Sequence, residues 1–186
     1  MQIVLTWDLF IIVFFTIIVS YSFIIGKSHT VKLVLSSYIS ILSADAIGNI
    51  INTFLTSTNP IIQVFSFNGH TPALIVVKIA LFIIFMITFS LKGSFEINME
   101  RSEGILEFFI TLFFGMLSAT LIISAILVFS SGSSFIMGGI PITESNIANM
   151  YNQSYLVKAM ILNYNLWFAL PVIAFLVMSL SRINEE

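Results

Sequence analysis

The side chains best placed to do chemistry lie in one apolar stretch, SSYISILSADAIGNIINTF, which contains four serines, two asparagines and one aspartate. At the 100° steps of a helix, three of the polar residues share one face: Asp45, Asn49 and Asn52. An aspartate at the centre of a membrane helix costs about 2.5–3.5 kcal/mol to insert, so such a residue usually faces the protein interior and has a partner. We therefore look for a positive charge at the same depth.

Lys78 is the expected partner of Asp45. Asp45 lies eight residues before Thr53, where its apolar segment ends, and Lys78 lies seven residues after Thr71, where the next one begins. At about 1.5 Å per helical residue, both lie about 10–12 Å below the same membrane surface. Two interpretations stay open: a structural ion pair that fixes helix register, with Asn49 and Asn52 adding hydrogen bonds, or a proton or ion relay or substrate counter-ion.

Other chemistry has little support in the sequence. The chain has no cysteine, which excludes thiolate nucleophiles and cysteine metal sites. It contains no H-E-x-x-H, G-x-S-x-G or paired-carboxylate motif, and no serine or threonine has a His or Lys at a spacing typical of a nucleophile. His29 and His70 are predicted on opposite sides of the membrane. We predict no enzymatic activity, no catalytic residue, no metal site and no cofactor.

The elements that must position these residues are membrane helices. Of the 186 residues, 58% are hydrophobic and 9% charged, and nineteen Phe stand against seven Lys and Arg. A soluble domain carries about 25% charged residues, and so small a core cannot hide this much apolar surface. The composition predicts an all-α, polytopic transmembrane bundle formed by one domain, residues 1–186. The net charge of -2 does not favour a nucleic-acid partner.

Five windows are long and apolar enough to cross a bilayer, which takes about 20 residues per helix. They are residues 9–25, 31–52, 72–91, 105–129 and 165–180.

The segment between the fourth and fifth windows is predicted to lie outside the membrane. It begins as a Gly/Ser-rich loop, and from residue 145 apolar side chains such as Met150 and Val157 recur at helical spacing. We expect an amphipathic helix over about 145–163, in the outer interface or docked over the mouth of the bundle. Near the N-terminus, Trp7 and Asp8 are expected to form an interfacial anchor, with Asp8 capping the first helix.

Basic residues predict the orientation. Five of the seven fall on one side of the five-span arrangement, Lys158 falls on the other, and Lys78 lies within a span. The five are Lys27, Lys32, Lys92, Arg101 and Arg182. Positive charge stays in the cytoplasm, so the N-terminus is predicted outside and the C-terminus inside.

Two stripes of small residues are expected to pack helices together, because small side chains let membrane helices approach closely. One stripe is Ser36, Ser40 and Ser43, on nearly the opposite face from Asp45. The other stripe is Thr111, Gly115 and Ser118 in the fourth span.

A series of short motifs runs along the first two-thirds of the chain: Trp7-Asp8, Gly26-Lys27, residues 31–36, Glu107, Thr111, Gly115 and residues 118–123. In this order they resemble the colicin V production (CvpA) family of bacterial inner-membrane proteins. The resemblance covers about residues 5–130. It departs from the family pattern at Ser118-Ala119, where the family often has Arg-Gly, and at Lys32-Leu33, where it often has Arg-Glu; the fifth span lies beyond the four-span family core.

The resemblance implies a non-enzymatic, multi-pass protein of the bacterial cytoplasmic membrane that assists toxin export or production, or envelope homeostasis. The residues also allow a small oligomeric transporter or channel subunit with Asp45 and Lys78 in its path. Because the chain has no inverted repeat for alternating access, transport would need several copies. The expected partners are the lipid bilayer and either another membrane protein or further copies of this chain.

Overall fold

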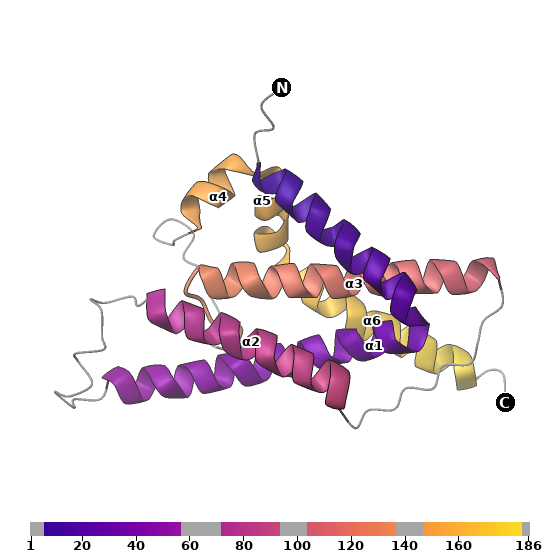
Figure 1. Ribbon diagram of the computed structural model, residues 1–186, viewed down its shortest axis with the longest axis horizontal. Coiled ribbons are helices and arrows are strands. Elements are labelled where there is room, and N and C mark those ends of the chain that lie inside the picture. The colour runs from indigo at the N-terminus through magenta and orange to yellow at the C-terminus, as the bar shows by residue number, and fades with distance from the viewer. Residues whose placement is uncertain (1–5, 57–71, 94–103, 137–146, 184–186) are drawn as a thin grey trace.

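The structure, a computed structural model, describes residues 6–56, 72–93, 104–136 and 147–183, and these form helices and turns without a strand (Figure 1). The all-helical prediction is confirmed for this part of the chain. The helices are α1 (Trp7–Thr56), α2 (Pro72–Lys92), α3 (Ile105–Ser130), α4 (Ala148–Gln153), α5 (Tyr155–Leu162) and α6 (Tyr164–Ile183).

Helix α1 consists of two arms that meet at a corner at Gly26. Its φ of 79° and ψ of 171° lie in a region that is essentially restricted to glycine. The Thr30 hydroxyl donates to the carbonyls of Gly26 at 2.9 Å and Ser22 at 3.1 Å, so it holds the backbone on both sides of the corner. The arms correspond to the first two predicted spans, but a single residue, and not a loop of several, separates them.

Most helices run along the long axis of the molecule in alternating directions (Figure 1). The corner of α1, the end of α2, the start of α3 and the end of α6 lie toward one end. The end of α1, the start of α2 and the end of α3 lie toward the other. We call the first of these the corner end. Lys27 and Lys92 belong to it, by their positions at the corner of α1 and in the last turn of α2.

Helix α3 forms the centre of the bundle, in contact with α1, α2, α5 and α6. The predicted packing stripe of Thr111, Gly115 and Ser118 is buried on it. A Cβ atom on Gly115 would lie 3.0 Å from both Cβ and Oγ of Ser22 in the first arm of α1. The two helices therefore approach as closely as a glycine allows, which is the role that small residues play in membrane bundles.

The serine stripe of α1 is also inside the bundle for most of its length. Ser36 and Ser40 are fully buried and Ser43 is half-buried. The Ser40 hydroxyl donates to the Ser36 carbonyl at 2.6 Å. Among the described residues, Ser36 Oγ is the buried side-chain polar atom without a hydrogen-bond partner.

The helix predicted over residues 145–163 is interrupted in the structure, and its first two residues lie outside the described part. Helices α4 and α5 are separated by Ser154, which has an extended backbone (φ -126°, ψ 124°) and whose Oγ accepts from the Val157 amide. The buried residues of α5 pack against the first arm of α1 and against α3. The short helix is thus docked on the bundle.

Asp8 supports this break instead of capping its own helix as predicted. Its Oδ1 accepts hydrogen bonds from Ser154 Oγ at 2.6 Å and from the Leu156 amide at 3.0 Å. A carboxylate at a helix N-terminus satisfies free amides and complements the helix dipole. In α1 the Leu9 amide donates to Thr6 Oγ1 at 3.3 Å. Asp8 therefore ties the start of α5 to the start of α1.

Helix α6 follows α5 after a bend of 65° and contains the buried Pro171. A proline removes one helical hydrogen bond and loosens the preceding turn. The Tyr38 hydroxyl of α1 donates to the Phe168 carbonyl in that turn, and the two rings meet edge to face at 5.2 Å. Within the described ranges, α1, α2 and α3 are long and apolar enough to cross a membrane, and the bent pair α5–α6 is a fourth candidate.

Candidate functional site: a closed polar cluster around Asp45 and Lys78

The contact between Asp45 and Lys78 that the sequence predicts is present. Lys78 Nζ lies 2.7 Å from Asp45 Oδ1. Asp45 is 0% exposed and Lys78 is 4% exposed. Asp45 belongs to the second arm of α1 and Lys78 to the second turn of α2. The ion pair therefore joins two helices inside the bundle.

Asn49 closes one side of the pair. It lies four residues after Asp45, one turn along the same face of α1. Lys78 Nζ donates to Asn49 Oδ1 at 2.8 Å, and Asn49 Nδ2 donates to Ser134 Oγ at 3.0 Å. The asparagine thus links the ammonium group to a residue that follows α3.

The segment after α3 completes the cluster. Ser134 Oγ donates to Asp45 Oδ2 at 2.7 Å, and the Ile136 amide donates to the same oxygen at 2.9 Å. Asp45, Lys78, Asn49 and Ser134 form a closed ring of hydrogen bonds. We call these four residues the polar cluster. Both carboxylate oxygens are engaged, so the cluster holds α1, α2 and the segment after α3 at one point.

The path of the Lys78 side chain depends on Gly48. A Cβ atom at this position would lie 2.5 Å from Lys78 Cγ and 2.7 Å from Cε, too close for any real contact. The lysine stem therefore crosses α1 over the bare backbone of the glycine. Its ammonium group lies 5.9 Å from the centre of the Phe129 ring of α3, within the range of a cation–π interaction.

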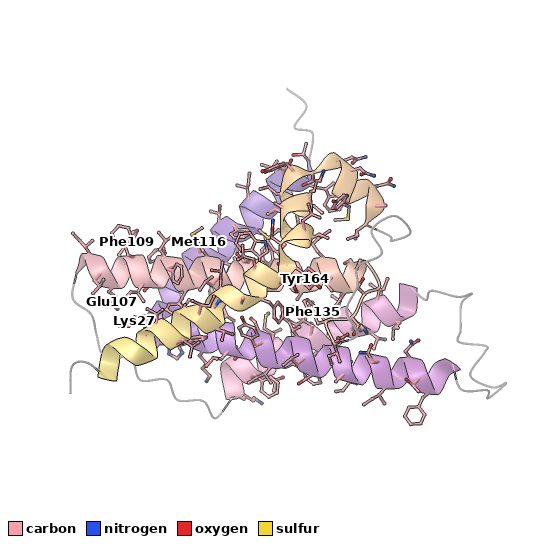
Figure 2. The ribbon with its side chains drawn as sticks, turned by 180° about the vertical axis from the view of Figure 1, so that it is seen from behind. Lys27, Glu107, Phe109, Met116, Phe135 and Tyr164 are labelled. Atoms are coloured by element: carbon pink, nitrogen blue, oxygen red, sulfur yellow. The ribbon has the colours of Figure 1, made fainter. Side chains whose placement is uncertain are left out.

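Aromatic rings surround the backbone next to Ser134. Phe135 packs on Phe168 with ring centres 4.8 Å apart and on Phe129 at 5.5 Å. Figure 2 shows Phe135 beside Tyr164 at the start of α6, and their ring centres are 6.5 Å apart. These contacts anchor the segment after α3 in the apolar core, which keeps Ser134 and the Ile136 amide in place.

The sequence predicts a Gly/Ser-rich loop after the fourth span, and residues 131–136 form turns and irregular backbone after α3. Ser131 and Ser133 are buried; Ser131 Oγ donates to the Val128 carbonyl at 2.6 Å and forms a second hydrogen bond with Ser133 Oγ at 2.7 Å. The predicted loop is present at residues 131–136, and the sequence did not indicate that it folds against the bundle. Their polar groups find partners inside the protein.

Asn52 is the third polar residue predicted on the Asp45 face. Asn52 is exposed one turn beyond Asn49. Three residues of the site were not predicted from the sequence: Gly48, Ser134 and Ile136. Gly48 could have been recognised, because it lies one turn from Asp45 and glycine is unfavourable in the interior of a helix. No feature of the sequence indicated Ser134 and Ile136, because they lie 89 and 91 residues from Asp45 along the chain.

Protein groups satisfy the polar cluster on several sides. In the described part of the chain, no three His, Cys, Asp or Glu side chains group as a metal site would require. Removing one partner from a buried ion pair leaves the other charge uncompensated, at a cost of about 3–5 kcal/mol. The geometry therefore favours the structural interpretation of the pair over the relay.

Comparisons with known proteins do not assign this chain to a family. No family model, no curated protein and no solved structure matches this chain.

Proposed function

We propose that this chain is a non-catalytic, multi-pass membrane protein whose bundle is a fixed scaffold pinned by Asp45 and Lys78. Its role is to assist toxin export or production, or envelope homeostasis, in a bacterial cytoplasmic membrane, as the resemblance to the colicin V production family implies. The observation that carries the scaffold is the closed ring: each charge of the pair is bound by protein groups on more than one side.

The scaffold crosses the membrane five times, with the N-terminus outside. An uninterrupted helix over the 48 residues Trp7–Phe54 would measure about 72 Å, more than twice the hydrocarbon core of about 30 Å. The corner at Gly26 supports two spans within α1. With α2, α3 and α6 the number is five. Lys27 and Lys92 both belong to the corner end, which supports placing that end in the cytoplasm.

The same ring argues against the conducting alternative. A relay residue must exchange its proton or ion with water, and in membranes such residues line a water-filled path. Asp45 and Lys78 are almost fully buried and their polar partners are other protein groups. A conducting subunit would have to break this ring in each cycle.

Ion flux through the purified full-length chain in proteoliposomes tests this choice. With a pH-sensitive dye and separate proton and potassium gradients, we expect fluxes equal to those of protein-free vesicles. A matched sample carries Asp45→Asn together with Lys78→Met. Flux in the wild type that disappears in this double variant would overturn the scaffold and establish the conducting subunit.

Photo-cross-linking in native membranes tests the assisting role. Phe109 and Met116 project from α3 away from the bundle (Figure 2) and are 59% and 49% exposed. A photoreactive amino acid at either position should give a discrete adduct with another membrane protein. A ladder at multiples of the chain's own mass would show a homo-oligomer instead. Adducts with lipid alone at both positions would contradict the role.

A further inference from the structure

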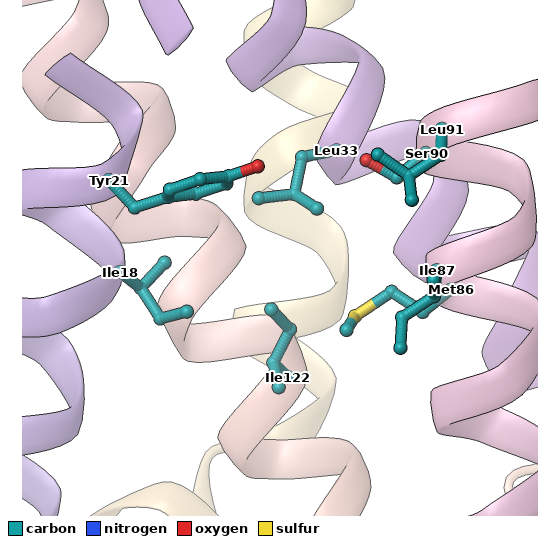
Figure 3. Close-up of a pocket in the computed structure, with 8 residues that line it drawn as sticks. All are labelled: Ile18, Tyr21, Leu33, Met86, Ile87, Ser90, Leu91 and Ile122. Carbon is teal, nitrogen blue, oxygen red and sulfur yellow. The ribbon is translucent and has the colours of Figure 1, made fainter. Parts of the chain in front are cut away.

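A second feature of the bundle lies apart from the polar cluster: a groove of about 200 Å³ between the two arms of α1, the last turns of α2, and α3 (Figure 3). It is nearer to the corner end, since Ser90 and Leu91 of its wall directly precede Lys92. Its wall includes Ile18, Tyr21, Leu33, Met86, Ser90 and Ile122.

The groove has a polar and an apolar part. Figure 3 shows the hydroxyl groups of Tyr21 and Ser90 directed toward its centre, on either side of Leu33. The other part is formed by the side chains of Ile18, Met86 and Ile122. Ligand sites commonly combine a mostly apolar wall with a few placed polar groups. This polarity matches an amphiphile whose polar end lies near the two hydroxyls.

The wall is open to the surroundings of the bundle. Tyr21 is 43% exposed and Leu91 is 70% exposed, and both lie in helices apolar enough to cross a membrane. The surrounding solvent at this level is therefore lipid. An apolar cavity of about 150 Å³ can stay free of water and bind apolar molecules, and hydrocarbon chains are the apolar molecules present there.

Charge at the end of the groove selects among lipids. Lys92 follows Leu91 directly, ends α2 and is exposed. A lysine at the membrane surface attracts anionic headgroups, and one such contact raises the affinity for an anionic lipid about fivefold. We infer that this groove binds one acyl chain of an anionic phospholipid, with Tyr21 and Ser90 hydrogen-bonding its glycerol ester or phosphate oxygens. The inference requires that the chain lies in a membrane, and it stands apart from the proposed scaffold role.

Photolabelling in nanodiscs tests this site. The full chain is reconstituted with increasing fractions of phosphatidylglycerol carrying a diazirine in mid-chain, and labelled peptides are quantified by mass spectrometry. We expect saturable labelling at residues 86–91 and around Ile122. Unlabelled phosphatidylglycerol should compete about fivefold better than phosphatidylcholine.

A matched pair of variants localises the effect. Ile87, on the wall of the groove, and Ile84, elsewhere on α2, are 49% and 57% exposed. Ile87→Trp should fill the groove and remove the saturable component, whereas Ile84→Trp should leave it unchanged. Should Ile87→Trp fail to fold, Tyr21→Phe combined with Ser90→Ala should weaken the competition by the headgroup. Labelling that rises linearly with probe and is uniform along α2 would overturn the site, and equal competition by both lipids would overturn its preference for anions.

Discussion

At the scale of single residues, the polar cluster shows how a membrane bundle accommodates a charge pair. A carboxylate and an ammonium group each cost several kcal/mol to remove from water, and their mutual attraction offsets this only with good geometry and further hydrogen bonds. Asp45 receives three donors, namely Lys78, Ser134 and the Ile136 amide. Lys78 donates also to Asn49 and faces an aromatic ring. These neighbouring groups thus form the hydrogen bonds that the ion pair alone would leave unmade.

The first prediction follows from the full set of partners around Asp45 and Lys78. Asp45→Asn and Lys78→Met should each lower the free energy of unfolding by about 3–5 kcal/mol, because each leaves one buried charge unpaired. The double variant should recover part of the loss, since an asparagine oxygen can still accept from Ser134 and Ile136. Thermal unfolding in detergent and abundance in membranes measure both effects. Lys92→Met, the same change at the exposed end of α2, is the control, and losses that simply add in the double variant would refute the coupling.

The second prediction concerns the glycine under the lysine stem. Gly48→Ala places a methyl group 2.5 Å from Lys78 Cγ, so the lysine must move away from Asp45. Overpacking of this kind costs about 1–3 kcal/mol. In a Lys78→Ala background the same change should cost almost nothing, because the obstructing stem is gone. An equal cost in both backgrounds would show that the methyl group meets something other than Lys78.

At the scale of elements, length and hydropathy predicted which segments form long helices. They did not predict features that depend on contacts between residues far apart in the sequence. The predicted spans at 72–91, 105–129 and 165–180 lie within α2, α3 and α6, because an apolar run of that length has few alternatives to a helix. The break at Ser154 was not predictable, since its partner Asp8 is 146 residues away. The contacts of Ser134 and Ile136 with Asp45 were missed for the same reason.

The third prediction tests the corner of α1. Gly26 has φ 79° and nothing within 4 Å of an added Cβ, so the cost of Gly26→Ala comes from the backbone alone. That conformation is strained for any other residue by about 1–3 kcal/mol, and the variant should unfold at lower denaturant concentration by that amount. Ile50→Ala, at an exposed position in the second arm of α1, serves as the control. Unchanged stability would show that the two arms do not need the glycine conformation to meet.

At the scale of the whole molecule, the two features lie toward different ends of one bundle. The polar cluster is formed near the ends of α1 and α3 and the start of α2, and the groove lies near the corner end. The sequence placed Asp45 and Lys78 at matched depth because helical rise converts residue number into distance. It contained no signal for the groove, because that surface needs three helices to be assembled first.

The last prediction decides how many times the chain crosses the membrane. The natural chain has no cysteine, so single cysteines can be labelled without background. Thr6 and Phe54, near the two ends of α1, and Lys92, at the end of α2, are exposed in the structure. If the two arms are separate spans with the N-terminus outside, cysteines at Thr6 and Phe54 should react with an impermeant maleimide in intact cells. A cysteine at Lys92 should react only after permeabilisation, because the lysines at the corner end hold it in the cytoplasm. Opposite sides for Thr6 and Phe54 would mean that α1 crosses once and would refute the five-span arrangement. The reverse accessibility of all three positions would keep five spans and refute the orientation.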